Sequence, residues 1–136
     1  YLADINKLNE YLYELTGVRP DILRFPGGSA TANATPTVMK EIIAKVTERG
    51  YLYYDWDVVS GDDTPTVYEP WHLAERILNG VKEKDHAIVL LHDSNGPRTT
   101  PQAVEIVIDK LSKEEYRFEA LTNQVEPVHI KTDRLQ

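Results

Sequence analysis

Three short segments of the sequence place ionisable side chains beside glycine, proline or serine. They are Arg24-Phe25-Pro26-Gly27-Gly28-Ser29, then Asp55-Trp56-Asp57 with Ser60-Gly61-Asp62 close behind it, and Leu90-Leu91-His92-Asp93-Ser94. His92 directly follows an apolar run that would hold its imidazole on a rigid element, and imidazole titrates in the range that suits proton transfer at neutral pH. The sequence contains no Cys, which excludes thiol catalysis, disulfides and zinc–thiolate sites. The pattern therefore indicates acid–base chemistry centred on His92.

Each of these residues also has an ordinary structural interpretation. Arg24 could cap a strand at the surface, where most charged side chains lie, and His92 could be a hydrogen-bonded structural histidine. Asp57 and Asp62 could cap loops, and Trp56 could belong to the core. The other histidines are predicted to be surface residues: His72, His86 and His129.

Helices and strands alternate along the chain. Helices are expected to end at Gly17, to run from Thr35-Pro36 to Gly50, to cover about residues 69–83, and to begin at Thr100-Pro101. Strands are expected over residues 21–25, 51–58, 87–91 and 116–121, with the third buried on both faces. Apolar residues at helical spacing predict the inward helix faces: Ile5, Leu8, Leu12 and Leu15; Val38, Ile42, Ile43 and Val46; Leu73, Ile77, Leu78 and Val81; Val104, Val107, Ile108 and Leu111.

This alternation predicts an α/β fold built on a parallel sheet. In such folds the active site gathers where strands end and the following loops begin. The three polar segments stand at three predicted strand ends, so we expect them to meet at one rim. One domain is expected over residues 1–121, followed by a polar, aperiodic tail over residues 122–136.

Charge and hydropathy limit the partners of the chain. Its 136 residues carry a net charge of -7, and 41% are hydrophobic and 27% charged, a balance typical of globular proteins. The sequence has no basic cluster, so nucleic-acid binding is not expected. It also has no apolar run long enough to span a bilayer.

Taken together, the three segments resemble the later signature motifs of the polysaccharide deacetylases, the NodB-type domains of carbohydrate esterase family four. Arg24-Phe25-Pro26-Gly27-Gly28-Ser29 resembles the third motif, in a variant of Gram-positive bacterial members. Trp56-Asp57-Val58-Val59-Ser60-Gly61-Asp62 resembles the fourth motif, and Leu90-Leu91-His92 the fifth. The order and spacing agree from the first helix to the last strand. The resemblance implies that the chain is the C-terminal part of a distorted (β/α) barrel.

Members of this family hydrolyse N- or O-acetyl groups on polymers such as peptidoglycan and chitin. The resemblance implies a divalent metal, which we expect to be zinc, held by an Asp and two His, with a second Asp as general base. Those residues belong to the family motifs Thr-Phe-Asp-Asp-Gly and His-x-x-x-His, and neither motif occurs here. No metal ligand is therefore assigned in this chain. The ligands and the base are expected in an N-terminal portion of the same domain, on the same or a separate chain.

The resemblance also implies roles for the motifs that are present. His92 would be the general acid that protonates the departing amine, and Gly27 would offer its N–H to the developing oxyanion. Arg24 would hold the catalytic Asp of the missing motif. Leu90 would line the pocket for the acetyl methyl group, and Trp56 would wall the groove.

The fourth motif departs from the usual Asp-x-x-Asp-Trp pattern. Val59 stands where the first Asp is usual, and Asp63 where the Trp is usual. The carboxylate that orients His92 could therefore belong to Asp57 or Asp62, and Asp62 is preferred because it keeps the second Asp of the pattern.

Two interpretations of function follow. The first is a polysaccharide deacetylase of the cell surface or the extracellular space, with this chain inactive by itself. The second is a non-catalytic carbohydrate-binding or structural module on the same fold.

The pattern opens with a helix at Tyr1 where a barrel would have a preceding strand, so this start resembles a cut. A chain without those strands is expected to expose apolar core and a sheet edge, and therefore to be poorly stable or to self-associate.

Overall fold

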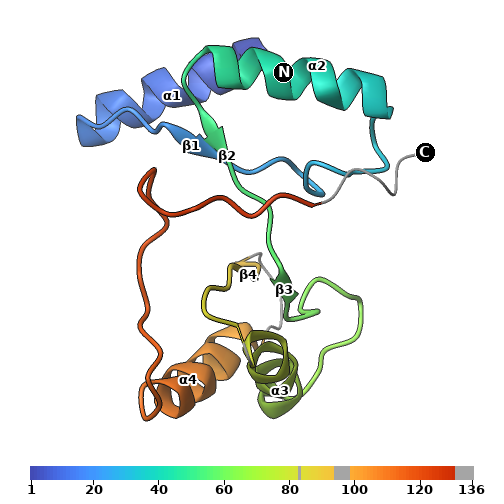
Figure 1. The fold of residues 1–136 in the computed structure, drawn as a ribbon, viewed down its shortest axis with the longest axis vertical. Coiled ribbons are helices and arrows are strands. Elements are labelled where there is room, and N and C mark those ends of the chain that lie inside the picture. The colour runs from blue at the N-terminus through green and yellow to red at the C-terminus, as the bar shows by residue number, and fades with distance from the viewer. Residues whose placement is uncertain (83, 94–98, 131–136) are drawn as a thin grey trace. The chain divides into compact units, whose positions relative to one another are not determined.

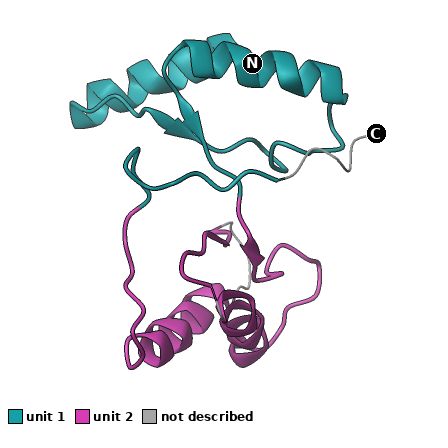
Figure 2. Ribbon diagram, in the orientation of Figure 1, with its two compact units in different colours: residues 1–55, 121–136 teal, residues 56–120 magenta. Residues whose placement is uncertain are grey.

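The computed structural model describes residues 1–82, 84–93 and 99–130. In chain order the described elements are α1 (Leu2–Thr16), β1 (Ile22–Leu23), α2 (Pro36–Glu48), β2 (Leu52–Tyr53), β3 (Val58–Val59), α3 (Pro70–Val81), β4 (Val89–Leu90) and α4 (Thr100–Leu111) (Figure 1). Two compact units divide the chain (Figure 2). Unit 1 comprises Tyr1–Asp55 and Leu121–Gln136, and unit 2 comprises Trp56–Ala120.

Unit 1 is built on the parallel pair of β1 and β2, in which Ile22 lies opposite Leu52. Helices α1 and α2 both lie on one side of this pair (Figure 1). Helix α2 begins as the Thr-Pro signal predicts, because the Thr35 side chain accepts a hydrogen bond from the Val38 N–H (3.3 Å) and the next residue is proline. The buried core of this unit is formed by Phe25, Met39 and Val46.

Unit 2 is built on the parallel pair of β3 and β4, with α3 and α4 packed against each other on one side of it. The register places Val58 opposite Val89 and Val59 opposite Leu90. Because the strands are parallel, their carboxyl ends lie at the same edge. The buried core consists of Val58, Leu73, Ala74, Ile77, Val81, Ala103, Val107 and Leu111.

The positions of the helices agree with the sequence pattern, but several residues predicted to face inward are exposed. Leu8 and Leu15 of α1 are 57% and 65% exposed, and Val38 and Ile108 are also exposed. In α2 and α4 the predicted Val46, Val107 and Leu111 are buried, and Met39 and Ala103 are buried beside them. Apolar spacing identifies a stripe on a helix, whereas burial also requires a neighbouring element on that side. Within the described ranges, every helix is too short or too polar to cross a bilayer.

The strands differ more from the prediction. The strand expected over residues 51–58 is interrupted, because β2 and β3 pair with different partners. The run over residues 87–91 is half-buried, not fully buried, and residues 116–121 form no strand. Among the described residues no strand lies beside Tyr116 and Phe118 to pair with them, so these β-favouring residues form no ladder. The segment after Leu121, predicted as a tail, is bound to Tyr54, whose hydroxyl donates to the backbone oxygens of Thr122 and Val125.

The packing of unit 2 predicts very different costs for two isoleucine truncations. Ile77→Ala should destabilise the unit by about 2–5 kcal/mol, because the Ile77 side chain is 2% exposed and its loss leaves a cavity. Ile108→Ala should change the stability by no more than about 0.5 kcal/mol, because Ile108 is 45% exposed. Urea unfolding followed by fluorescence measures both, since Trp56 and Trp71 lie in this unit. Equal losses in the two variants would contradict this packing.

Candidate active site

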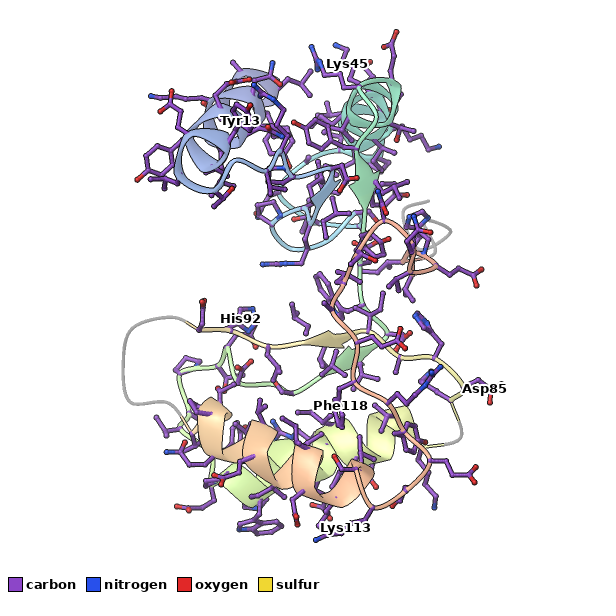
Figure 3. All side chains as sticks on the ribbon, turned by 90° about the vertical axis from the view of Figure 1, so that its left-hand side faces the viewer. Tyr13, Lys45, Asp85, His92, Lys113 and Phe118 are labelled. Atoms are coloured by element: carbon purple, nitrogen blue, oxygen red, sulfur yellow. The ribbon has the colours of Figure 1, made fainter. Side chains whose placement is uncertain are left out.

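His92 and Asp62 are joined by two hydrogen bonds in unit 2. The His92 backbone N–H donates to Asp62 Oδ2 (2.9 Å), and His92 Nδ1 lies 2.8 Å from Asp62 Oδ1. The Asp62 side chain is only 1% exposed, while the His92 side chain is 28% exposed. One edge of the imidazole is therefore held by a buried carboxylate while part of the ring reaches the surface (Figure 3).

Two hydroxyl groups complete the surroundings of the Asp62 carboxylate. Ser60 Oγ donates to Oδ1 (2.8 Å), and Thr100 Oγ1, at the first residue of α4, donates to Oδ2 (2.8 Å). The backbone between Ser60 and Asp62 turns at Gly61, where φ is +76°. A Cβ at Gly61 would lie 2.5 Å from Arg76 Nη1, which itself donates to the Ser60 backbone oxygen (3.3 Å). Only glycine suits this turn, which directs the Asp62 side chain inward.

These hydrogen bonds determine the charge of Asp62. Burial alone would raise the pKa of Asp62, but the bonds from the His92 side chain and backbone, Ser60 and Thr100 lower it to about 2. The carboxylate is therefore ionised at neutral pH and can only accept hydrogen bonds. It follows that His92 Nδ1 carries a proton, and that Nε2 is the ring nitrogen left for a substrate.

The pairing of β3 with β4 explains how these residues meet. Asp62 follows the carboxyl end of β3 and His92 follows that of β4, and the parallel register sets these ends side by side. Figure 3 shows His92 beside β4, on the other side of the unit from Lys113 near the end of α4. The expectation that strand ends deliver ionisable residues to one edge therefore holds for this pair.

Among the described residues, the structure gives Asp57 no hydrogen bond to His92. Asp57 is exposed, and its carboxylate has no hydrogen-bond partner in the part of the chain that the structure describes. Trp56 and Leu90 are half-buried, and Leu90 lies in β4 opposite Val59. Between the two acids considered from sequence, the structure joins His92 to Asp62 and not to Asp57.

In unit 1 the segment from Arg24 to Ser29 forms a tight loop. Gly27 and Gly28 have φ values of +74° and +79°, and a Cβ at Gly27 would lie 2.7 Å from Thr31 Oγ1. Gly27 is exposed, and its N–H has no acceptor among the described residues, whereas the Gly28 N–H donates to the Phe25 oxygen (2.8 Å). Arg24 is exposed at the start of the loop. The Gly27 N–H is thus available to an external acceptor.

Asp55 is a buried residue to which the sequence analysis assigned no role. It is 1% exposed and accepts hydrogen bonds from the Ser29 N–H (2.8 Å), the Ser29 hydroxyl and the Ile130 N–H (2.9 Å). The sequence does contain one sign of this role, because Asp55 stands within the aromatic run over residues 51–58. A carboxylate buried in such a run needs hydrogen-bond donors. The roles of Ser60 and Thr100 were also missed, because a hydroxyl near a helix start is ordinarily explained as a cap.

The remaining histidines separate into two groups. His86 and His129 are exposed, as predicted. The prediction is wrong for His72, which is half-buried, with its ring stacked on Trp71 at 3.6 Å and its buried Nδ1 lacking a hydrogen bond within the described ranges. The Tyr68 ring also meets it edge-on at 6.4 Å, so two aromatic side chains cover part of the imidazole.

Asp62, Asp63 and His92 bring ligand atoms within 4.8 Å of one another, close enough to consider a metal ion. The donor set nevertheless does not fit one. The Asp62 oxygens already accept four hydrogen bonds, and His92 Nδ1 carries a proton that it donates to Asp62. A metal would have to replace these bonds, so we derive no chemistry through a metal at this cluster.

Comparison with known proteins identifies the fold. No protein-family model matches the chain. The catalytic domain of peptidoglycan N-acetylglucosamine deacetylase from Eubacterium rectale superposes with a TM-score of 0.86 at 30% identity, over 94% of this chain and 59% of that one. The chain has the fold of the polysaccharide deacetylases. Polysaccharide deacetylase Bc1974 from Bacillus cereus superposes with a TM-score of 0.76 at 23% identity, over 100% of this chain and 65% of that one.

A sequence relative agrees with this result. YheN of Bacillus subtilis (strain 168), named as a candidate polysaccharide deacetylase, is 25% identical in an alignment of 134 positions that covers 94% of this chain and 44% of that protein. The chain thus spans between 44% and 65% of the length of these three relatives. The resemblance and the fold class predicted from sequence, part of a NodB-type (β/α) barrel, are confirmed.

The low pKa of Asp62 predicts a pH dependence of stability. An unfolded Asp titrates near 3.9, so a folded pKa of about 2 stabilises unit 2 above roughly pH 4, and this stabilisation is lost as the pH falls toward 2. Its size should be about 2 kcal/mol. The Asp62→Asn variant should lack it, whereas Asp63→Asn, at the exposed neighbour, should keep it. Urea unfolding at pH 6 and pH 2 measures the difference, and an equal loss in Asp62→Asn and the unmodified chain would contradict the assignment.

Proposed function

We propose that the domain containing this chain removes N-acetyl or O-acetyl groups from a polysaccharide such as peptidoglycan or chitin, in a metal-dependent hydrolysis. The observation that carries the proposal is the Asp62–His92 pair, in which a buried anion holds an accessible imidazole at the end of parallel strands. The similarity to polysaccharide deacetylases supports the same reaction class, and the relative from Eubacterium rectale is named for a peptidoglycan substrate.

His92 is proposed as the general acid. Hydrolysis of an acetamide requires the departing nitrogen to be protonated, because an amide anion leaves poorly. With Nδ1 bonded to Asp62, the protonated imidazole presents its Nε2–H to the leaving group. The adjacent carboxylate stabilises the positive charge of the ring and holds its orientation, as in other acid–base pairs. Such proton transfer contributes roughly 10²–10⁴-fold to the rate.

Gly27 is proposed to stabilise the oxyanion that forms when the acetyl carbonyl is attacked. Its N–H has no acceptor among the described residues, and a side chain at this position would collide with Thr31. A fixed backbone donor of this kind is more effective than water because it does not reorganise during the reaction. Leu90 is proposed to contact the acetyl methyl group, and Trp56 to contact the saccharide.

Arg24 is proposed to hold a catalytic Asp supplied from outside this chain. Asp57 remains a candidate for tuning the site through contacts with substrate, since its carboxylate is exposed. A divalent metal, which we expect to be zinc, would polarise the acetyl carbonyl when bound. Its ligands and the general base would come from the N-terminal portion of the domain. A cell-wall polymer as substrate would place the enzyme outside the cell or on its surface.

The proposal is tested by joining this chain to a segment that carries the first two family motifs, a protein termed the restored domain below. It should release acetate from an acetylated glucosamine oligomer, and a chelator should abolish the release. His92→Ala should lower kcat by roughly 10²–10⁴-fold, because the leaving group loses its proton donor. His86→Ala, which removes an exposed histidine of the same unit, should leave the rate unchanged.

The proposed reaction and the proposed role of His92 would be contradicted by different results. A folded, metal-loaded restored domain without activity on any acetylated glycan would refute the proposed reaction. Binding of chitin or peptidoglycan fragments by that inactive protein, measured by calorimetry, would favour a carbohydrate-binding module instead. Equal rates in His92→Ala and His86→Ala would refute the role of His92 while leaving the reaction itself in place.

A further inference from the structure

We infer that Asp55 is a positioning residue that fixes the Gly27–Ser29 loop in the conformation that presents the Gly27 N–H. The inference rests on the proposed function, because it assigns Asp55 a role in that reaction. Asp55 itself is buried and does not touch the reacting atoms. Its effect would pass through Ser29, which lies two residues after Gly27.

The contacts of Asp55 converge on this loop. One carboxylate oxygen accepts the Ser29 N–H (2.8 Å), and the other accepts the Ser29 hydroxyl and the Ile130 N–H (2.9 Å). Ser29 is itself 1% exposed, so both of its donors are removed from water. With its backbone and side chain both bound, Ser29 anchors the C-terminal side of the two positive-φ glycines.

The chemistry of the three donors requires a carboxylate at residue 55. Two N–H groups and one hydroxyl point at the side chain, and an ionised Asp only accepts hydrogen bonds. An Asn at this position would direct its own NH₂ toward at least one of those donors. A buried donor without a partner is unfavourable, so the loop would be expected to move away from this arrangement.

Asp55 also connects the loop to the C-terminal segment. Its backbone N–H donates to the Val128 oxygen (2.8 Å), and the ring of His129 stacks on Tyr53 at 4.0 Å. Together with the bond to Ile130, these contacts hold residues 128–130 beside the segment that follows β2. The segment predicted to be a tail therefore supplies one of the three hydrogen-bond donors to the Asp55 carboxylate, through the Ile130 N–H.

Amide hydrogen exchange and kinetics on the restored domain test this inference together. In the unmodified protein the Ser29 and Ile130 amides should be protected. Asp55→Asn should raise their exchange rates while leaving the amides of β4 unchanged, and it should lower kcat by about 10–100-fold. KM should change by no more than about twofold, because an oxyanion donor acts in the transition state and not on the bound ground state.

Two further variants separate positioning from general destabilisation. Asp21→Asn makes the same change at an exposed carboxylate of unit 1 and should alter neither exchange nor kcat. Ser29→Ala removes only the hydroxyl bond and should lower kcat by a smaller factor than Asp55→Asn. It also serves as the test variant if Asp55→Asn does not fold, and an unchanged kcat in it would then overturn the inference.

The outcomes also distinguish this inference from the proposed function. Unchanged exchange at Ser29 and Ile130 in a folded Asp55→Asn variant would overturn the inference, and so would an unchanged kcat. If the unmodified restored domain releases no acetate, the proposed reaction fails, and exchange alone then decides whether Asp55 holds the loop. A rise in KM with kcat unchanged would show that Asp55 serves binding, which also overturns the inference.

Discussion

A carboxylate buried in a protein must be surrounded by hydrogen-bond donors, because an unpaired buried charge is strongly unfavourable. Asp62 meets this requirement with donors from three places: Ser60 after β3, His92 after β4, and Thr100 at the start of α4. The orientation of the His92 ring, the turn at Gly61 and the approach of α4 to the strands all depend on this one group. The chemistry proposed for His92 depends on it as well, since the ionised carboxylate determines which ring nitrogen faces the substrate.

Much of the fold follows from local signals. Gly17 marks the end of α1, and Thr35-Pro36 marks the start of α2. Such signals can be recognised in the sequence because each acts within one helical turn. Burial is harder to predict, since it depends on elements distant in sequence. Leu8 and Ile108 have the spacing of core residues but are exposed, and the residues around Tyr116 have strand propensity but no strand to pair with. Tyr116 instead packs against the core of unit 2 and donates its hydroxyl to the Val81 backbone oxygen (3.1 Å), so contacts from other elements determine its environment.

The candidate site shows the same division. The placement of His92 and Asp62 at strand ends could be predicted, because parallel strands bring their carboxyl ends together. The choice of Asp62 over Asp57 could only be a preference, since both acids lie within the same motif. Asp55 could not be assigned from sequence, because one of its partners is Ile130, far along the chain in a segment without periodic pattern. Hydrogen-bond networks between distant segments leave little trace in local composition.

The state of the His92 ring is the most direct test of the account, and long-range ¹H–¹⁵N correlation spectroscopy measures it. With Asp62 ionised and bonded to Nδ1, the neutral ring should be the Nδ1–H tautomer, with an unprotonated Nε2. The exposed His86 provides an internal reference for an unconstrained ring. His92 should show a fixed Nδ1–H signal, and Asp62→Asn should lose it. An Nε2–H tautomer at His92, or averaging like that of His86, would contradict this expectation.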